Sequence, residues 1–224
     1  MEKATNTEQN HGPRLGDAAY FELKERLTRG FYKPGDKLTV RAIAETLSLS
    51  STPARDAINR LTSQNALVHT GPKTVIVPIL SQQELAEITL IRIALEGLAS
   101  ERAALNCQPK NIDNLLEIQH NINSALQAAA YADALWHNKE FHFLIYKLSD
   151  LPHLLDLIEG QWLRIGPSFF GLYPEFAEAR HGVRNHEMAI EALREKDGSA
   201  LRAAIENDIR DGFRRLKAVL PKRL

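Results

Sequence analysis

Three helical patterns in the C-terminal half carry polar residues on faces that are otherwise apolar. Burying a polar side chain costs several kcal/mol unless it finds a partner, so each of these residues needs an explanation. They are Asn138, His142, His186 and Asp208. Asn138 and His142 stand four residues apart on one helix, so a single ion could bridge them. Together the four offer a mixed nitrogen and oxygen ligand set, which suits Zn, Ni, Mn or Fe.

The same four residues also have a metal-free interpretation. A lone histidine on an apolar helix face is more often a hydrogen-bonded core residue than a ligand, and asparagine binds transition metals poorly. A hydrogen-bond network among Asn138, His142, His186 and Asp208 would account for the same pattern. Spacing alone leaves both interpretations open.

Arg92 is a second candidate for a buried charge. It shares a helical stripe with four apolar residues, so its guanidinium must find an anion or point outward. Glu96, one turn later, is the ordinary partner and would form an intrahelical salt bridge. Beside a metal ion, the arginine would instead bind a carboxylate. Tyr146, Trp162 and Arg164 could line a ligand cavity beside Arg92, although each is more often plain core or surface.

A different set of polar residues, in the N-terminal third, has the pattern of a DNA-reading helix. From Thr52 onward one helical face is apolar, and Arg55 and Asn59 lie on the other. The second helix of a helix-turn-helix must be arranged in this way to enter a major groove. Arg55 could form a forked contact with guanine, which is the commonest specific base contact. The alternative is a face that is merely solvated.

Further DNA contacts are expected around this helix. Ser50, Ser51 and Thr52 stand at its N-terminus, where hydroxyls and free N–H groups suit phosphate oxygens. Arg41, on the preceding helix, is placed for a phosphate or groove contact. Lys73, at the tip of an expected hairpin, would meet the DNA backbone or the minor groove.

The residues that surround the DNA-reading helix predict a winged helix-turn-helix over residues 15–78. We expect Phe31 on the buried stripe of the first helix, and Thr52 as the N-cap of the third with Pro53 after it. Residues 1–14 are polar and aperiodic and are expected to form a disordered arm. The expected elements are helices near 20–31, 40–47 and 52–61 and a hairpin of 66–69 and 74–78.

The rest of the chain, residues 79–220, is expected to be a separate helical domain. Ser81 is a plausible helix cap, with Glu84 three residues later. No convincing strand follows it, and helices of this length form an antiparallel bundle. The predicted fold class is therefore mainly α. Helical patterns cover roughly residues 81–107, 109–130, 131–149, 151–170, 174–197 and 199–218.

The composition is that of an ordinary soluble globular protein and excludes intrinsic disorder, a collagen-like chain and a disulfide scaffold. The 224 residues include 28 Lys+Arg, 28 Asp+Glu and a single cysteine. Residues 15–78 carry nine basic and six acidic residues, so an anionic partner would meet that end. With no membrane span and no secretory signal in the sequence, we expect a cytoplasmic protein without membrane contact.

The N-terminal third resembles the GntR family of bacterial regulators. The residues that carry the resemblance are LTRGFYKPGDKL (27–38), RAIAETLSLSSTPARDAINRL (41–61) and ALV (66–68). The resemblance implies a recognition helix that contains Arg55 and is followed by a short wing. Ser51 departs from the family pattern, because many members have there an arginine that reads a base.

The C-terminal part is similar to the FadR-like, or FCD, branch of that family. The matching motifs are IRIALE (91–96), NKEFH (138–142) and NHEMAIEAL (185–193). This resemblance implies a helical domain with a metal site, and an arginine, matched by Arg92, near the carboxylate of a small organic acid. Asn138 replaces the family's usual aspartate and Asp208 replaces its last histidine, whereas His142 and His186 remain.

These observations predict a transcriptional regulator, and the resemblance implies a repressor. A homodimer would bind a pseudo-palindromic operator in double-stranded DNA, and a small organic acid would switch its affinity. A metal-dependent enzyme with an accessory helix-turn-helix domain is the alternative, but no HExxH motif, general base or nucleophile motif supports it. A third alternative is a helical scaffold whose basic end is only solvated. We expect no catalytic residues.

Overall fold

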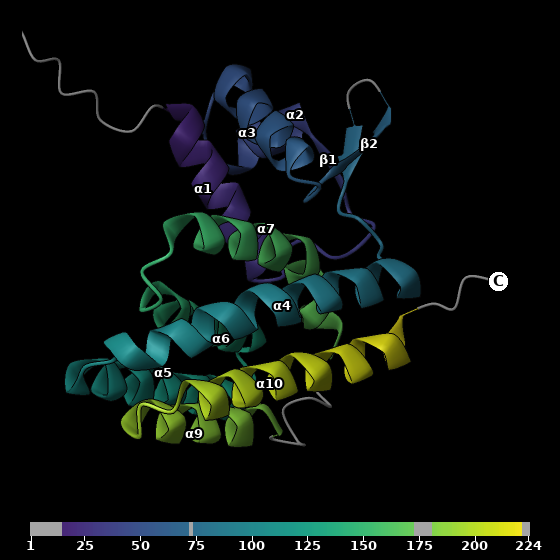
Figure 1. Ribbon diagram of the computed structural model, residues 1–224. Coiled ribbons are helices and arrows are strands. Elements are labelled where there is room, and N and C mark those ends of the chain that lie inside the picture. Colours follow the sequence, from purple (N-terminus) through teal and green to yellow (C-terminus); the bar gives the residue numbers. More distant parts are fainter. Residues whose placement is uncertain (1–14, 72–73, 173–180, 221–224) are drawn as a thin grey trace, which may run out of the picture.

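The computed structural model describes residues 15–71, 74–172 and 181–220. Helices α1–α3 and a small sheet form one end of the molecule, and the remaining helices form a bundle beneath them (Figure 1). The predicted fold class, mainly α with an N-terminal winged helix-turn-helix and a helical bundle, is confirmed. The expected disordered arm, residues 1–14, and Lys73 lie outside the described residues.

The N-terminal helices are α1 (Leu15–Thr28), α2 (Val40–Thr46) and α3 (Ser51–Ser63). Their apolar stripes meet in one core that includes Leu23, Leu27, Ile43 and Leu61. The prediction that Phe31 belongs to this core is wrong. Helix α1 ends at Thr28, and Phe31 beyond it is exposed.

Helix α3 begins earlier than the sequence indicated. Its N-cap is Ser50, which has extended backbone angles, so Thr52 lies inside the first turn rather than at the cap. The Ser50 side chain makes no capping hydrogen bond. Ser50 therefore gives the first-turn N–H groups of α3 no side-chain acceptor.

The wing contains one more strand than the sequence predicted. Strands β1 (Lys37–Thr39), β2 (Val68–Gly71) and β3 (Thr74–Ile76) form an antiparallel sheet in the order β1-β3-β2. Strand β1 follows a turn in which Gly35 has a φ of +92° and donates its N–H to Val77. A side chain is strained in that conformation, which explains the glycine.

The bundle begins at α4, where the Ser81 side chain and Glu84 form the predicted capping box. Proline stands in the first turn of α5 and of α7. The bundle elements are α4 (Gln82–Asn106), α5 (Pro109–Gln127), α6 (Tyr131–Lys147), α7 (Pro152–Phe169), the 3-10 turn η1 (Phe170–Leu172), α9 (His181–Arg194) and α10 (Gly198–Val219).

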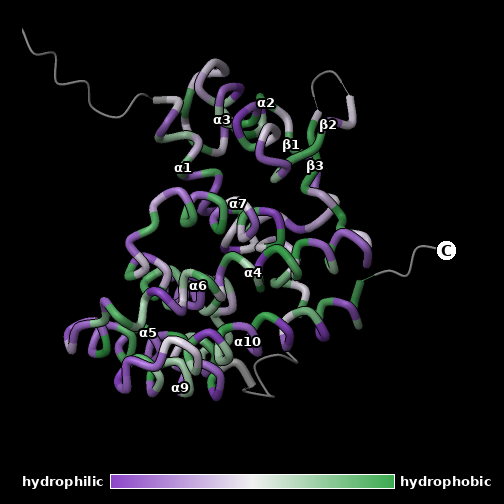
Figure 2. Tube along the Cα trace, in the orientation of Figure 1, coloured by the Kyte–Doolittle hydropathy of each residue, from purple (hydrophilic) through white to green (hydrophobic). Residues whose placement is uncertain are grey.

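Helix α4 contacts α10, α7, α6 and α9. Helix α10 runs along it, α9 packs on α10, and α5 pairs with α6 (Figure 1). Apolar and polar residues alternate along these helices (Figure 2), and their apolar stripes enclose a core that includes Phe141, Ile145 and Ile205. Within the described residues, no helix is long and apolar enough to cross a membrane.

Helix α7 joins the two ends of the molecule, because it packs on both α1 and α4. Its Leu163 is part of the N-terminal core. Lys24 of α1 forms a salt bridge of 2.6 Å with Glu159 of α7, and Arg29 forms one of 2.9 Å with Asp133 of α6. The N-terminal end is therefore attached to the bundle by both apolar and ionic contacts.

Candidate functional site

Three helices bring His142 (α6), His186 (α9) and Asp208 (α10) together inside the bundle. One potential ligand atom from each residue lies within 4.8 Å of the others. The two histidine Nε2 atoms are 3.3 Å apart, and His142 Nε2 is 3.2 Å from Asp208 Oδ2. Both histidines are buried, and Asp208 is partly buried. These three predicted metal ligands therefore form one cluster.

The orientation of His186 is fixed by Gln119 of α5. The Gln119 amide nitrogen donates to Asn123, so its oxygen faces His186 Nδ1 at 2.6 Å. An amide oxygen only accepts, so His186 Nδ1 carries the proton and Nε2 presents a lone pair to the cluster. The ring of Phe141 stacks on the imidazole at 3.9 Å and holds its plane.

A second chain of hydrogen bonds fixes His142. Tyr146 donates its hydroxyl proton to Glu96 at 2.5 Å, and the tyrosine oxygen lies 3.1 Å from His142 Nδ1. Because the tyrosine hydroxyl donates its proton to Glu96, the tyrosine oxygen can accept a hydrogen bond from His142 Nδ1–H. His142 Nε2 then also presents a lone pair to the cluster. A metal-binding histidine is ordinarily oriented in this way by a partner on its other nitrogen.

The cluster therefore joins two imidazole nitrogens and one carboxylate, and when both rings are neutral in these tautomers each Nε2 turns a lone pair toward its neighbours. Burial and the neighbouring His142 lower the pKa of His186 to about 3. Burial raises the pKa of Asp208, but the hydrogen bond and charge that a protonated His142 supplies, together with His186 and Asn185, outweigh it and bring it to about 2. Three converging acceptors repel one another unless a cation lies between them. Two histidines and one carboxylate with open positions are a ligand set of Fe(II), and the donor types also suit Zn, Ni and Mn.

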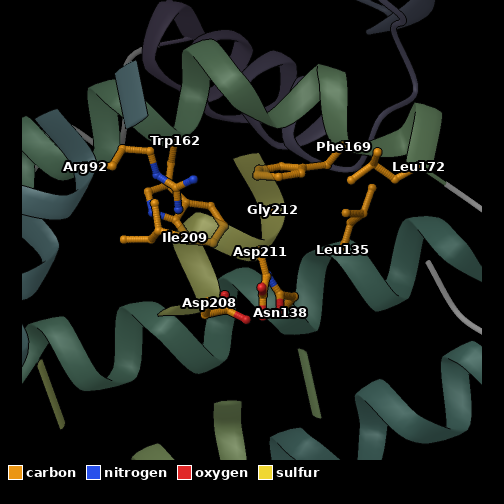
Figure 3. Close-up of a pocket in the computed structure, with 10 residues that line it drawn as sticks. All are labelled: Arg92, Leu135, Asn138, Trp162, Phe169, Leu172, Asp208, Ile209, Asp211 and Gly212. Atoms are coloured by element: carbon orange, nitrogen blue, oxygen red, sulfur yellow. The ribbon is translucent and has the colours of Figure 1, made fainter. Parts of the chain in front are cut away.

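Asn138, the fourth predicted ligand, lies on the wall of a cavity beside this cluster. In Figure 3 its side chain lies next to Asp208 and Asp211 at one end of the cavity. Asn185 donates to Asp211 at 2.9 Å and to Asp208 at 3.4 Å. The sequence analysis missed Asn185 and Asp211, although Asn185 directly precedes His186 and Asp211 follows Asp208 by one turn.

The cavity has a charged side and an apolar side. Arg92 and Trp162 form one wall, and Phe169, Leu172 and Leu135 form another (Figure 3). None of the last three was predicted, because apolar side chains carry no signal that separates a cavity wall from a core. Ile209 and Gly212 of α10 complete the lining.

Arg92 lies on the cavity wall. It also forms the intrahelical salt bridge with Glu96 that the sequence offered as the alternative to ligand binding. Its Nε is 2.6 Å from Glu96 Oε1 and its Nη2 is 3.2 Å from Glu96 Oε2, and both side chains are buried. Burial lowers the pKa of Arg92, but the charge and hydrogen bonds of Glu96 raise it above its ordinary value. The guanidinium also lies 4.7 Å from the ring centre of Trp162. It is held charged and oriented at the cavity.

Two of the predicted effector-binding residues lie elsewhere. Tyr146 is buried behind the cluster, where it connects Glu96 to His142 instead of lining the cavity. Arg164 lines a different hollow, between α7 and α1. The prediction that Arg164 shares the cavity with Trp162 is wrong because residues two apart on a helix face different ways.

The predicted DNA-reading face is exposed. On α3, Ala54, Ala57, Ile58 and Leu61 are buried, whereas Arg55 and Asn59 face solvent. Both line a groove between α2, α3 and the wing, to which Arg41, Ser51 and His69 also contribute. His69 was not predicted. The sequence signal that could have indicated it is its place in the expected hairpin, and the structure shows that it is exposed on β2.

The remaining basic residues near this groove differ in how firmly neighbouring side chains hold them. Arg41 is exposed and forms a solvent-facing pair of 2.8 Å with Glu45, which an anionic ligand could displace. Arg60 is held away from the face, since it binds Asp17 at 2.7 Å and lies 3.9 Å from the ring centre of Tyr20. Ser51 and Thr52 are exposed in the first turn of α3, as expected for phosphate contacts.

Comparison with known proteins agrees with both halves of this architecture. Residues 15–74 match the family of bacterial regulatory proteins called gntR, and residues 87–211 match the FCD domain. The chain belongs to the GntR family and carries an FCD domain. The relationship that the sequence motifs indicated is thereby confirmed.

Relatives of this GntR protein are regulators. It is 34% identical to the HTH-type transcriptional regulator McbR of Escherichia coli K12 over 183 residues, which are 81% of this chain and 83% of McbR. The structure of E. coli McbR superposes with a TM-score of 0.86 at 31% identity, over 92% of this chain and 98% of that one. The gluconate operon transcriptional repressor of Bacillus subtilis is 24% identical, over 85% of this chain and 80% of the repressor. The protein is a transcriptional regulator and not an enzyme.

Proposed function

We propose that this GntR protein is a cytoplasmic homodimer that represses transcription from a pseudo-palindromic operator. A small carboxylate metabolite in the FCD cavity, bound on a divalent metal, switches its operator affinity. Residues 15–78 read the DNA, and residues 79–220 bind the effector and dimerise. The observation that carries the proposal is the convergence of three fixed acceptors, His142, His186 and Asp208, beside a cavity with a buried arginine.

A bound metal is inferred from the tautomers of His142 and His186. Gln119 and Tyr146 leave both histidine Nε2 atoms as acceptors, 3.3 Å apart. Zn, Ni, Mn or Fe would be held by these two atoms and Asp208, with Asn138 beside the open side. A metal bound there would supply a Lewis-acidic site for one carboxylate oxygen of the effector.

A carboxylate effector is inferred from the cavity wall that Arg92 and Trp162 form. Arg92 supplies a fixed guanidinium, and the indole Nε1–H of Trp162 is buried without a hydrogen-bond partner among the described residues. An unpaired buried donor is costly, so an acceptor from a ligand or a water is expected there. A small acid with oxygens at both ends would satisfy the Trp162 N–H and the metal together. The name of the B. subtilis relative, a gluconate operon repressor, is consistent with an organic acid.

The DNA part rests on the exposure of α3. Arg55 and Asn59 would read base edges in the major groove, while Ser50, Ser51, Thr52 and Arg41 would contact phosphates. Lys73, outside the described residues, would extend the contact from the wing. Base contacts set sequence preference and phosphate contacts set salt dependence, so the two groups can be separated by experiment.

The test is selection of bound fragments from sheared genomic DNA with purified protein at physiological salt. Wild-type protein should enrich one inverted repeat. Arg55→Ala should lose that enrichment while its bundle stays folded. Arg194→Ala, which removes an exposed arginine from α9 far from the groove, should behave like wild type. Enrichment by Arg55→Ala equal to that of wild type would contradict the assignment of the recognition helix.

A further inference from the structure

Helix α4 has one long face that nothing in the described chain covers. Helices α10, α7 and α6 pack on its other sides. The uncovered face carries Leu90, Leu98 and Leu105, whose exposed fractions are 70%, 45% and 64%. Ile91 and Leu95 on the same face are only partly buried, and Ala94 between them is exposed.

The spacing on this face is that of a helix that pairs with another helix. Ile91, Ala94, Leu98 and Leu105 follow steps of three, four and seven residues, which keep them on one stripe. A contiguous apolar stripe on a protein surface marks an interaction site more often than do single exposed leucines. The small Ala94 in the middle would let a second helix approach closely.

One acid and one base stand at equal distances from the centre of the stripe, and a further acid on this face, Glu101, is already paired with Arg202 at 2.9 Å. Glu87 lies toward the start of α4 and Arg102 toward its end, about 11 Å on either side of the Ala94–Leu95 peptide by helical rise. Both are exposed, and neither has an ion-pair partner within the described part of the chain. Each therefore has a free charge at the edge of the apolar stripe.

We infer that the occupant of this face is a second copy of the chain, with the two α4 helices antiparallel across a two-fold axis beside Ala94 and Leu95. In that register Ile91 packs on Leu98 of the partner subunit, and Glu87 faces Arg102 of the partner subunit. A two-fold axis repeats each contact, so two ion pairs flank four apolar side chains. Parallel helices would instead set Glu87 against the partner's Glu87 and Arg102 against the partner's Arg102, which is repulsive.

The antiparallel arrangement also orients the two DNA-reading ends, which is where the inference rests on the proposed function. In Figure 1, α4 runs across the molecule, with α1–α3 on one side of it and α9 on the other. The axis that relates antiparallel α4 helices is perpendicular to α4 and runs from the bundle toward α1–α3. Both α3 helices then lie on the same side of the dimer, as one operator requires. An axis parallel to α4 would place them on opposite sides.

Charge reversal tests the register. Glu87→Arg sets like charges against Arg102 at two places in the dimer, and Arg102→Glu does the same with two acids. We expect each single variant to raise the dimer dissociation constant about tenfold or more in sedimentation equilibrium at low salt. The double variant should return to within about threefold of wild type, because it restores both pairs. Single variants that dissociate no more than wild type would overturn the inference.

Cysteine crosslinking tests the axis independently. In a Cys107→Ser background, Ala94→Cys places one thiol beside the two-fold axis, so mild oxidation should give a disulfide-linked dimer. Leu116→Cys, an exposed position on α5, is the matched control and should stay uncrosslinked. If the wild-type protein is a dimer and the Ala94→Cys variant forms no crosslink, the α4 interface is overturned and the proposed homodimer stays intact. A wild-type protein that is monomeric at micromolar concentration would overturn both.

Discussion

Trp162 and Leu163 are consecutive residues of α7 that lie in different hydrophobic cores. Trp162 belongs to the bundle core and lines the cavity, whereas Leu163 is buried in the core of the DNA-reading end. Any ligand that moves Trp162 therefore moves a residue that supports α1–α3. This relationship gives a physical route from the FCD cavity to α1–α3, since packed interiors transmit small shifts.

Leu163→Ala should weaken that connection. The loss of a fully packed leucine should lower the free energy of unfolding by ~2–5 kcal/mol, and it should reduce the response of operator affinity to cavity ligands while metal affinity stays unchanged. Leu157→Ala, exposed on the same helix, is the control and should cost less than about 0.5 kcal/mol. Denaturant unfolding and metal titration measure both quantities. Equal behaviour of the two variants would show that α7 does not carry the coupling.

Gln119→Leu should weaken metal binding without removing a ligand. The amide oxygen of Gln119 fixes the His186 tautomer through a 2.6 Å hydrogen bond, and loss of such a partner typically lowers metal affinity 10–100-fold. Asn123→Ala removes only the residue behind Gln119 and should have a smaller effect. Competition with a chelator of known affinity measures the change. Unaltered metal affinity in Gln119→Leu would argue against His186 as a ligand.

Removal of Arg92 alone should be costly because Glu96 would remain buried without its partner. Arg92→Met should lower the free energy of unfolding by ~3–5 kcal/mol, and Arg92→Met with Glu96→Gln should recover most of that loss. The exposed pair of Arg41 and Glu45, also four residues apart on one helix, supplies the comparison, since Arg41→Met should leave the free energy of unfolding nearly unchanged. If the double variant is no more stable than Arg92→Met, the buried pair is not the source of the cost.

The metal-free protein should lose stability in acid. His186 has a pKa of about 3 when folded against an ordinary value of 6.5, so between these values the unfolded chain takes up a proton that the folded protein does not. The free energy of unfolding therefore falls as pH decreases from about 6.5, by up to ~1.4 kcal/mol per pH unit. Asp208, whose pKa drops from 3.8 to about 2 on folding, adds a second fall below about pH 4.

His186→Gln should flatten the decline between pH 6 and pH 4. His120→Gln is the control, because His120 is exposed on α5 and should leave the slope unchanged. Unfolding in denaturant at each pH, with a chelator present, provides the measurement. A slope in His186→Gln equal to that of wild type would mean that another group takes up the proton.

Most of the fold could be predicted from the sequence because long amphipathic helices repeat their pattern over many turns. Breaks at Pro109 and Pro152, and the capping box of Ser81, mark helix starts that the structure confirms. Strand β1 was missed because three residues are too few to show an alternating pattern.

The candidate site could be predicted only where a polar residue interrupts an apolar stripe. That signal identified His142, His186 and Asp208, which the structure brings together. It could not identify Gln119, whose partner His186 is 67 residues away along the chain. Long-range hydrogen bonds of this kind depend on how the helices pack, and no local pattern records them.

The most direct test of the account is the affinity of the protein for the operator that genomic selection recovers. Titrations would compare the chelated protein, the metal-loaded protein and the metal-loaded protein with each of a panel of small carboxylates. We expect at least one carboxylate to shift the Kd about 5–150-fold, and to have no such effect on the variant with His142→Ala and His186→Ala. A Kd that is identical under every condition, and identical in that variant, would contradict an effector switch in the FCD cavity.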